Sequence, residues 1–327
     1  MNAPVDIKAM EGMFQHHYRQ IEVSFDPDHA VAWTFFKPIG VPCFNLGLLS
    51  ELRAHDAAIE ASGGRLLFRG ELRQIRYYVA ASKTGKVFNL GGDLALFQKL
   101  VTAGDRDALM NYAKLCIDNM YPRICNYNSP MTTISLVQGE ALGGGFETAL
   151  SSNVLIAERQ ARMGMPEILF NLFPGMGAYS LLARRVGMKR AEELILSGRI
   201  FTAEEMHQMG IVDLLVEDGT GESAVRDFVR KHERRRNGMQ AVFNCRQHFH
   251  RVTYDEMLNI TNVWVDAAMR LQEKDLKLMS RLVRSQLRFV QNGATPELPT
   301  HAARSQLGNH KAGIALEVPG YAELAMA

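Results

Sequence analysis

The strongest constraint on this chain is a run of three glycines, residues 143–145, between a strand-like segment and a glutamate. Residues 131–137 (MTTISLV) are rich in β-branched and apolar side chains, as a buried strand is, and residues 148–152 have helical character. Glycine has no side chain, so the backbone can make close approaches there. We therefore expect this turn to direct backbone N–H groups and the Glu147 carboxylate to one place.

A second glutamate, Glu167, follows twenty residues later in the turn GMPE, residues 164–167. Each glutamate alone has an ordinary explanation: Glu147 as a first-turn helix residue worth about 0.3–1 kcal/mol, Glu167 as a solvated turn residue. The glycines alone could be structural, or a phosphate loop, although no lysine follows them as a P-loop requires. Together, two carboxyls and an amide donor site favour chemistry on a carbonyl compound, in which amides hold an oxyanion and carboxyls move protons.

Composition excludes several classes of protein. The chain has 327 residues with 47% apolar and 22% charged side chains, enough for a large core, and its net charge of +2 gives no argument for nucleic acid. Its four cysteines form no C-x-x-C pair, which fits a reducing cytoplasm. We find no secretory signal and no stretch suited to span a membrane, and we expect a cytoplasmic protein.

Other motifs carry weaker signals. Residues 175–177 (GMG) half resemble a dinucleotide fingerprint but lack its third glycine and a preceding strand. His248 and His250 are two apart on an expected helix and so do not share a face. We therefore expect neither a metal nor a cofactor. The basic run at residues 230–236 is a solvated helix face or, alternatively, a dock for an acidic partner or a phosphate-bearing substrate.

The order of elements predicts an α/β core followed by helices, because a strand-then-helix pattern recurs three or four times. We expect an N-terminal arm at 1–20, a core at 21–222, a helical region at 223–291 and a tail at 292–327. Expected strands lie near 31–35, 75–80, 87–90, 131–137, 154–157 and 211–216. Expected helices lie near 46–59, 94–121, 180–186 and 190–196, and one begins at Thr202 with Glu205 completing a capping box.

Several of these segments, in this order, resemble the crotonase (enoyl-CoA hydratase/isomerase) superfamily. They are residues 137–147, 163–167, 173–177, 196–199 and 203–212, preceded by 88–94, which resembles the first oxyanion segment of that family. The resemblance implies a crotonase-like spiral of repeated β-β-α units with a C-terminal helical region that covers an acyl pocket. It also implies a homotrimer or a hexamer.

Within the superfamily the chain looks most like the diffusible signal factor synthases, on the segment NLGGDLALF at residues 89–97 and the helical insert at 94–121. The resemblance implies a thioester substrate on acyl carrier protein or CoA. It assigns the oxyanion amides to Leu90, or Gly91 if the alignment slips by one, and to Gly144. It assigns catalysis to Glu147 and Glu167, and the pocket walls to residues on the glycine turn and the C-terminal helices, namely Met176, Trp264 and Leu282.

The function that the resemblance implies is dehydration of a medium-chain 3-hydroxyacyl-acyl carrier protein to the cis-2-enoyl thioester. Hydrolysis of the thioester would then release a cis-2-unsaturated fatty acid as a quorum-sensing signal. Ordinary hydratases usually have alanine where this chain has Leu90, which argues against a hydratase of fatty-acid breakdown, but that activity stays open. So does a non-catalytic regulator that binds a sensor kinase. The sequence leaves open which glutamate is the base, and whether Trp264 is core or pocket wall.

Overall fold

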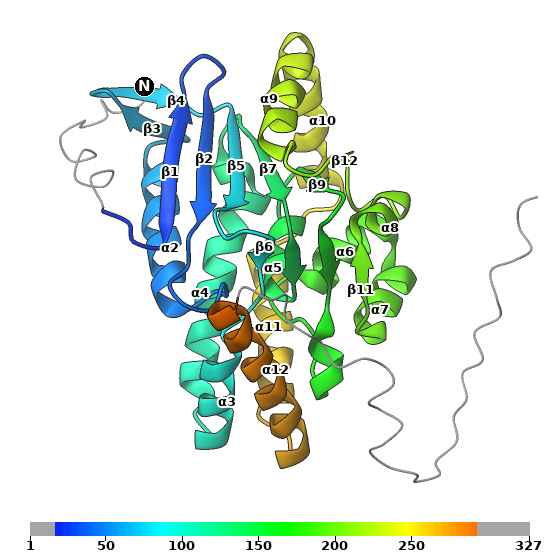
Figure 1. Ribbon diagram of the computed structural model, residues 1–327. Helices are drawn as coiled ribbons and strands as arrows, with labels where there is room; N and C mark the ends of the chain where they lie inside the picture. Colours follow the sequence, from blue (N-terminus) through cyan, green and yellow to red (C-terminus); the bar gives the residue numbers. More distant parts are fainter. Residues whose placement is uncertain (1–16, 293–327) are drawn as a thin grey trace, which may run out of the picture.

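Two sheets of unequal size form the centre of the computed structural model, which describes residues 17–292 (Figure 1). The larger sheet has the order β1-β2-β5-β7-β9-β12 and is parallel except for the β1-β2 hairpin. Its strands are β1 Ile21–Asp26, β2 Val31–Phe36, β5 Tyr77–Ser82, β7 Thr132–Val137, β9 Val154–Glu158 and β12 Leu214–Val216.

The smaller sheet has the order β11-β10-β8-β6, and each of its strands has three residues. They are β6 Val87–Asn89, β8 Glu140–Leu142, β10 Arg162–Gly164 and β11 Ile200–Thr202. Successive strands of the chain alternate between the sheets: β5, β7 and β9 lie in the larger and β6, β8 and β10 in the smaller. Helical segments follow each pair, so the repeated β-β-α unit is confirmed. Strands β3 Arg65–Phe68 and β4 Glu71–Gln74 form a separate hairpin.

Helices cover both faces of the larger sheet, so its central strands β2, β5, β7 and β9 are buried on both sides, as parallel strands usually are. On one face Trp33 and Tyr77 pack with Val225 and Val229 of α9. On the other, apolar side chains of the same strands pack against α2, α4 and α5. The helices of the core are α2 Leu46–Ala61, α3 Leu94–Ala103, α4 Arg106–Ile124, α5 Gly144–Leu150, α6 Ala178–Val186, α7 Met188–Ser197 and α8 Ala203–Gln208.

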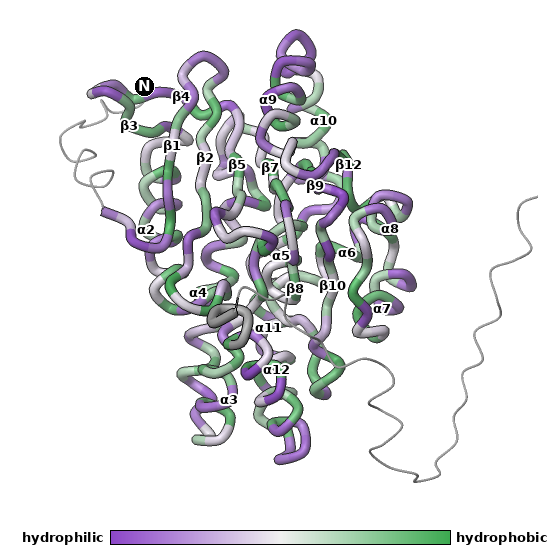
Figure 2. Tube along the Cα trace, in the orientation of Figure 1, coloured by the Kyte–Doolittle hydropathy of each residue, from purple (hydrophilic) through white to green (hydrophobic). Residues whose placement is uncertain are grey.

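The C-terminal part of the described chain is helical, as expected. It comprises α9 Gly221–His232, α10 Arg236–Phe249, α11 Tyr254–Ala268 and α12 Glu273–Asn292, with short 3-10 turns η1 Asn126–Asn128, η2 Pro166–Phe170 and η3 Glu233–Arg235 along the chain. Figure 1 shows α9 and α10 at one end of the larger sheet and α12 beside α3 at the other. In the hydropathy colouring of Figure 2, apolar and polar stretches alternate along both the strands and the helices. No helix within residues 17–292 is long and apolar enough to cross a bilayer.

Local capping explains where the helices begin and end. The expected capping box is confirmed: the Thr202 side chain accepts from the Glu205 N–H, and the Glu205 carboxylate accepts from the Thr202 N–H. The helix expected at 94–121 is in fact two helices, because Gly104 leaves α3 in a left-handed conformation (φ 69°) and Asp105 caps α4.

The strand expected at 211–216 is shorter than predicted. Residues Ile211 and Val212 turn their N–H groups back to the Met206 carbonyl at the end of α8, so only Leu214–Val216 pairs with β9. The helix expected at 148–152 begins earlier, at Gly144. Most of the expected arm and all but the first residue of the expected tail lie outside the described residues.

Candidate active site

The three glycines let the segments that carry the candidate site residues meet at the start of α5. Gly143 has φ 49° and ψ −122°, a conformation that favours glycine. A Cβ atom on Gly143 would lie 2.2 Å from Oε1 of Glu167, and one on Gly145 would lie 2.0 Å from the Asn89 carbonyl oxygen. The glycines therefore allow the end of β6 and the Glu167 carboxyl to pack against this turn. The close packing is a structural role, and it also brings the candidate site residues together.

Glu147 lies in the first turn of α5 and is 1% exposed. Its Oε1 accepts hydrogen bonds from the backbone N–H groups of Met176 and Ala178, both at 2.9 Å. Burial raises the pKa of Glu147 to about 7, although these two hydrogen bonds lower it. The turn at residues 175–177 therefore positions the Glu147 carboxyl, and we assign it no role in dinucleotide binding.

Glu167 lies in η2, directly after Pro166. The residue as a whole is half-buried, but its Oε2 is fully buried and has no hydrogen-bond partner among the described residues. Burial, and then the negative charge of Glu147, raise the pKa of Glu167 to about 8. Two neighbouring carboxyls with raised pKa values titrate as a pair, so at neutral pH the pair holds a proton that it can give to or take from a substrate.

Two backbone amides are free at this turn. The Gly144 N–H begins α5, so it has no intrahelical acceptor, and no other described residue accepts from it. The second free amide lies in the segment at residues 88–94. There the Leu90 N–H donates to the Pro42 carbonyl at 2.8 Å, and the Gly91 N–H donates to Oδ1 of Asn89 at 2.8 Å.

The free amide of this segment is therefore that of Gly92, one residue beyond the two that the resemblance assigned. The Gly92 N–H has no acceptor among the described residues, and a Cβ on Gly144 would lie 3.5 Å from the Gly92 nitrogen. Gly92 and Gly144 line one pocket with both glutamates. We therefore take the Gly92 N–H, and not that of Leu90 or Gly91, as the candidate donor of this segment. The Leu90 side chain still lines the pocket.

A pocket of about 690 Å³, partly open to solvent, contains both glutamates, and the three expected wall residues line it. Trp264 of α11 packs edge to face on Phe97, with ring centroids 5.1 Å apart, and Leu282 comes from α12. A Cβ on Gly175 would lie 2.2 Å from the Trp264 Cβ, so α11 packs directly on the turn that holds Glu147. Trp264 is thus both a core residue and a pocket wall.

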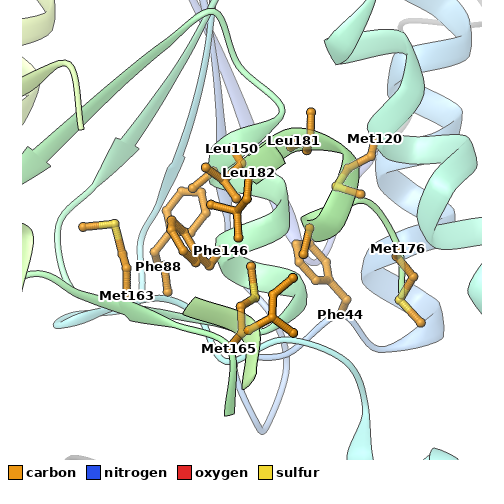
Figure 3. Packing of buried hydrophobic residues seen from close by; sticks show 14 of the residues in the cluster. Phe44, Phe88, Met120, Phe146, Leu150, Met163, Met165, Met176, Leu181 and Leu182 are labelled. Atoms are coloured by element: carbon orange, nitrogen blue, oxygen red, sulfur yellow. The ribbon is translucent and has the colours of Figure 1, made fainter. Parts of the chain in front are cut away.

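A second cavity of about 560 Å³ continues inward from the first, and the two share Gly92, Gly144, Glu147 and Met176 as walls. Beside Glu147 its walls are apolar, and Figure 3 shows three of them, Phe44, Met120 and Met176. The apolar walls beside Glu147 suit an acyl chain.

The histidines and the basic run considered in the sequence do not lie at this pocket. His248 and His250 are exposed on α10 and at its end, and Arg230 of the basic run pairs with Asp227 on the surface of α9. Among residues 17–292 no group of three or more His, Cys, Asp or Glu side chains is arranged to hold a metal ion.

Comparison with known proteins gives one family. Residues 70–269, which are 200 of the 327, match the model described as enoyl-CoA hydratase/isomerase. A Rhizobium meliloti protein named "Probable enoyl-CoA hydratase" is 33% identical over 183 residues, 56% of this chain and 63% of that one. Mevalonyl-coenzyme A hydratase of Beauveria bassiana is 35% identical over 142 residues, 41% of this chain and 49% of that one.

The multifunctional protein AIM1 of peroxisomal fatty acid beta-oxidation in Arabidopsis thaliana is 29% identical over 160 residues, 48% of this chain and 21% of that one. The chain thus spans less than two thirds of the length of these curated relatives. Among solved structures, enoyl-CoA hydratase from Bacillus halodurans has a TM-score of 0.66 and 18% identity, covering 80% of this chain and 98% of that one. DspI of Pseudomonas aeruginosa has a TM-score of 0.60 and 22% identity, covering 76% of this chain and 91% of that one.

Proposed function

This chain belongs to the enoyl-CoA hydratase/isomerase family of the crotonase superfamily, and within it we propose a two-step enzyme. It dehydrates a medium-chain 3-hydroxyacyl thioester to the cis-2-enoyl thioester and then hydrolyses the thioester, releasing a cis-2-unsaturated fatty acid. The observation that carries the proposal is the buried pair of carboxyls, Glu147 and Glu167, beside the free amides of Gly92 and Gly144.

In the first step the thioester oxygen accepts hydrogen bonds from the Gly92 and Gly144 N–H groups. Removal of a proton from C2 moves negative charge onto that oxygen, and preorganised donors stabilise it. Loss of one such donor costs about 3 kcal/mol in the oxyanion hole of a serine protease. A helix N-terminus strengthens the effect at Gly144, because the α5 dipole places partial positive charge there.

Proton transfer uses the two carboxyls as a pair. The ionised carboxyl takes the C2 proton, and the protonated carboxyl gives its proton to the 3-hydroxyl. The C2–H and C3–O bonds break, the C2–C3 double bond forms, and one water molecule leaves. The raised pKa values of Glu147 and Glu167 support this division, since a carboxyl with an ordinary pKa is ionised at neutral pH and donates no proton.

In the second step water attacks the thioester carbonyl carbon while a carboxylate of the pair takes its proton. The tetrahedral oxyanion forms at the same two amides, the C–S bond breaks, and the thiol leaves with the proton. This step is supported by the reuse of one oxyanion site and by the resemblance to signal synthases.

For the carrier we propose acyl carrier protein, with CoA as the alternative, and for the assembly a homotrimer or hexamer in the cytoplasm. The released acid would act as a quorum-sensing signal, and a sensor kinase would be a second partner. A hydratase of fatty-acid breakdown is the competing function, favoured by the names of the curated relatives.

The test is mass spectrometry of products after incubation with 3-hydroxydodecanoyl-acyl carrier protein. Free cis-2-dodecenoic acid is the expected product. If the enoyl product stays on its carrier, the protein is a dehydratase that does not hydrolyse the thioester. If only the CoA ester is turned over, the hydratase of fatty-acid breakdown is favoured. The double variant Glu147→Gln with Glu167→Gln should lose turnover. Glu158→Gln, at another buried carboxyl that accepts from the Gly221 N–H, is the matched control.

A further inference from the structure

The second cavity ends in polar side chains that the reaction does not use. Along α4 its walls run from Cys116 and Met120 to Arg123, and along α2 from Leu49 and Leu52 to Asp56. Seven helical residues span about 10 Å, so the cavity extends about that far along α4, from Cys116 past Asn119 and Met120 to Arg123. A straight alkyl chain leaving the catalytic pair would meet Asp56 and Arg123 at its far end.

These polar residues form one buried network. Asp56 is 2% exposed, and its Oδ1 accepts from the hydroxyls of Tyr127 at 2.8 Å and Tyr78 at 3.2 Å. The Thr34 hydroxyl donates to the Tyr78 hydroxyl at 2.9 Å. Arg123 lies over the Tyr78 ring, with its Cζ 5.4 Å from the ring centroid.

The network leaves donors and acceptors without partners at the cavity. Both hydrogen bonds to Asp56 reach Oδ1, and no described residue donates to its Oδ2. Arg123, 5% exposed, uses Nε and Nη2 on serine hydroxyls, while its Nη1 reaches no acceptor among the described residues. Asn119, 7% exposed, gives both protons of its amide to the carbonyls of Leu49 and Leu115, and its Oδ1 has no partner.

Asn119 Oδ1 is fully buried without a partner, and an unpaired neutral group of that kind costs about 1–3 kcal/mol. Oδ2 of Asp56 and Nη1 of Arg123 have no described partner and are not fully buried, so a group in the cavity can reach them. An apolar lining would serve a methyl-terminated acyl chain at no such cost. The polar end is therefore explained best by a ligand group that both donates and accepts.

We propose that this cavity end is a binding site for a hydroxyl group at the far end of the substrate's acyl chain. The hydroxyl donates to Oδ2 of Asp56 and accepts from Nη1 of Arg123. A terminal carboxylate fits less well, because it offers no proton to Asp56 or Asn119 and adds a second negative charge. The assignment rests on the proposed function in one respect only, that an acyl thioester occupies the pocket beside Glu147.

The experiment measures binding, so it does not depend on turnover. Titration calorimetry compares acyl-CoA analogues in which methylene replaces the thioester sulfur and the chain ends in a methyl, a hydroxyl or a carboxylate group, over a series of chain lengths. These analogues keep the carbonyl oxygen. The ketone cannot be hydrolysed, and the chain is made without a 3-hydroxyl so that it cannot be dehydrated. Binding of any of them with no dehydration of 3-hydroxyacyl substrates would separate failure of the proposed function from failure of this inference.

We expect the hydroxylated analogue to bind about two- to twelve-fold more tightly than its methyl-terminated partner at the best chain length. Asp56→Asn keeps an oxygen for the tyrosine hydroxyls and should remove most of that preference, while Glu158→Gln should retain it. If at every length the methyl-terminated chain binds the wild-type protein as tightly, the assignment is overturned, and this result needs no variant to fold. A preference for a terminal carboxylate would also overturn it.

Discussion

Replacement of Gly143 by alanine should separate folding from catalysis. The new Cβ would lie 2.2 Å from Oε1 of Glu167, and ordinary contact begins at 3.4 Å, so the carboxyl has to move by 3.4 − 2.2 = 1.2 Å. The carboxyl is the end of a flexible side chain and can rotate away, so the fold accommodates the change. A catalytic group displaced by about 1 Å can lose a factor of about 100 in rate, which is about 2.7 kcal/mol.

The assay combines kcat for dehydration with urea unfolding. We expect Gly143→Ala to lose about 1–3 kcal/mol of stability from its backbone conformation and about 100-fold in kcat. Gly104→Ala is the control, because Gly104 also has positive φ (69°) but open space around its Cβ position. It should lose about 1–2 kcal/mol of stability and keep its kcat.

One result would refute the reasoning. If folded Gly143→Ala turned over substrate within threefold of the wild-type rate, then the position of Glu167 against the glycine turn would not matter for the chemistry. The division of roles between two precisely placed carboxyls would then be wrong, whatever the stability of the variant. A similar loss of kcat in Gly104→Ala would point instead to general destabilisation as the cause.

Three further predictions follow from buried groups. The pKa values of Glu147 and Glu167 are raised to about 7 and 8, so the folded protein binds protons at these carboxyls more readily than the unfolded chain does. The free energy of unfolding, measured with urea, should therefore fall as pH rises from about 4.5 to 8. Replacing both glutamates by glutamine should remove this fall. Tyr78→Phe should cost about 1–3 kcal/mol in the same assay, because the Tyr78 hydroxyl links Thr34 to Asp56. Tyr77→Phe, one residue away on the opposite face, removes a hydroxyl with no described partner and should change stability by less than about 0.5 kcal/mol. Trp264→Ala should cost about 3–5 kcal/mol of stability and raise KM, since the side chain is both core and pocket wall.

Sequence patterns predict the larger elements of this fold because burial forces their periodicity. Strand β7 is buried along its whole length, and its residues are accordingly apolar, β-branched or small. Of the smaller sheet, only β6 corresponds to a strand expected from the residues, the one near 87–90. The strands β8, β10 and β11 have three residues each, too few for any period to show, and only the β-β-α units that the resemblance implies account for them.

The two candidate carboxyls and one candidate oxyanion amide were also within reach of sequence, because Glu147, Glu167 and Gly144 lie in glycine turns of recognisable spacing, and the structure brings all three to one pocket. The second amide was not. Whether an N–H is free depends on what accepts from its neighbours, and here Pro42 and the Asn89 side chain take the Leu90 and Gly91 protons. Tertiary contacts thus leave the Gly92 N–H as the free donor, and a local sequence pattern contains no information about such contacts.

The position of Asp56, by contrast, can be recognised as unusual from the spacing of apolar residues in the sequence. The apolar stripe of α2 runs through Leu49, Leu52 and Ile59, and Asp56 occupies the place on that stripe where a fourth apolar residue would lie. A carboxylate on the buried face of a helix is costly, so its presence points either to a structural network or to a ligand. The tyrosine hydroxyls on Oδ1 account for the first, and they leave Oδ2 for the second. A polar residue that breaks an apolar stripe thus marks the end of the acyl cavity as the place where this chain distinguishes one substrate from another.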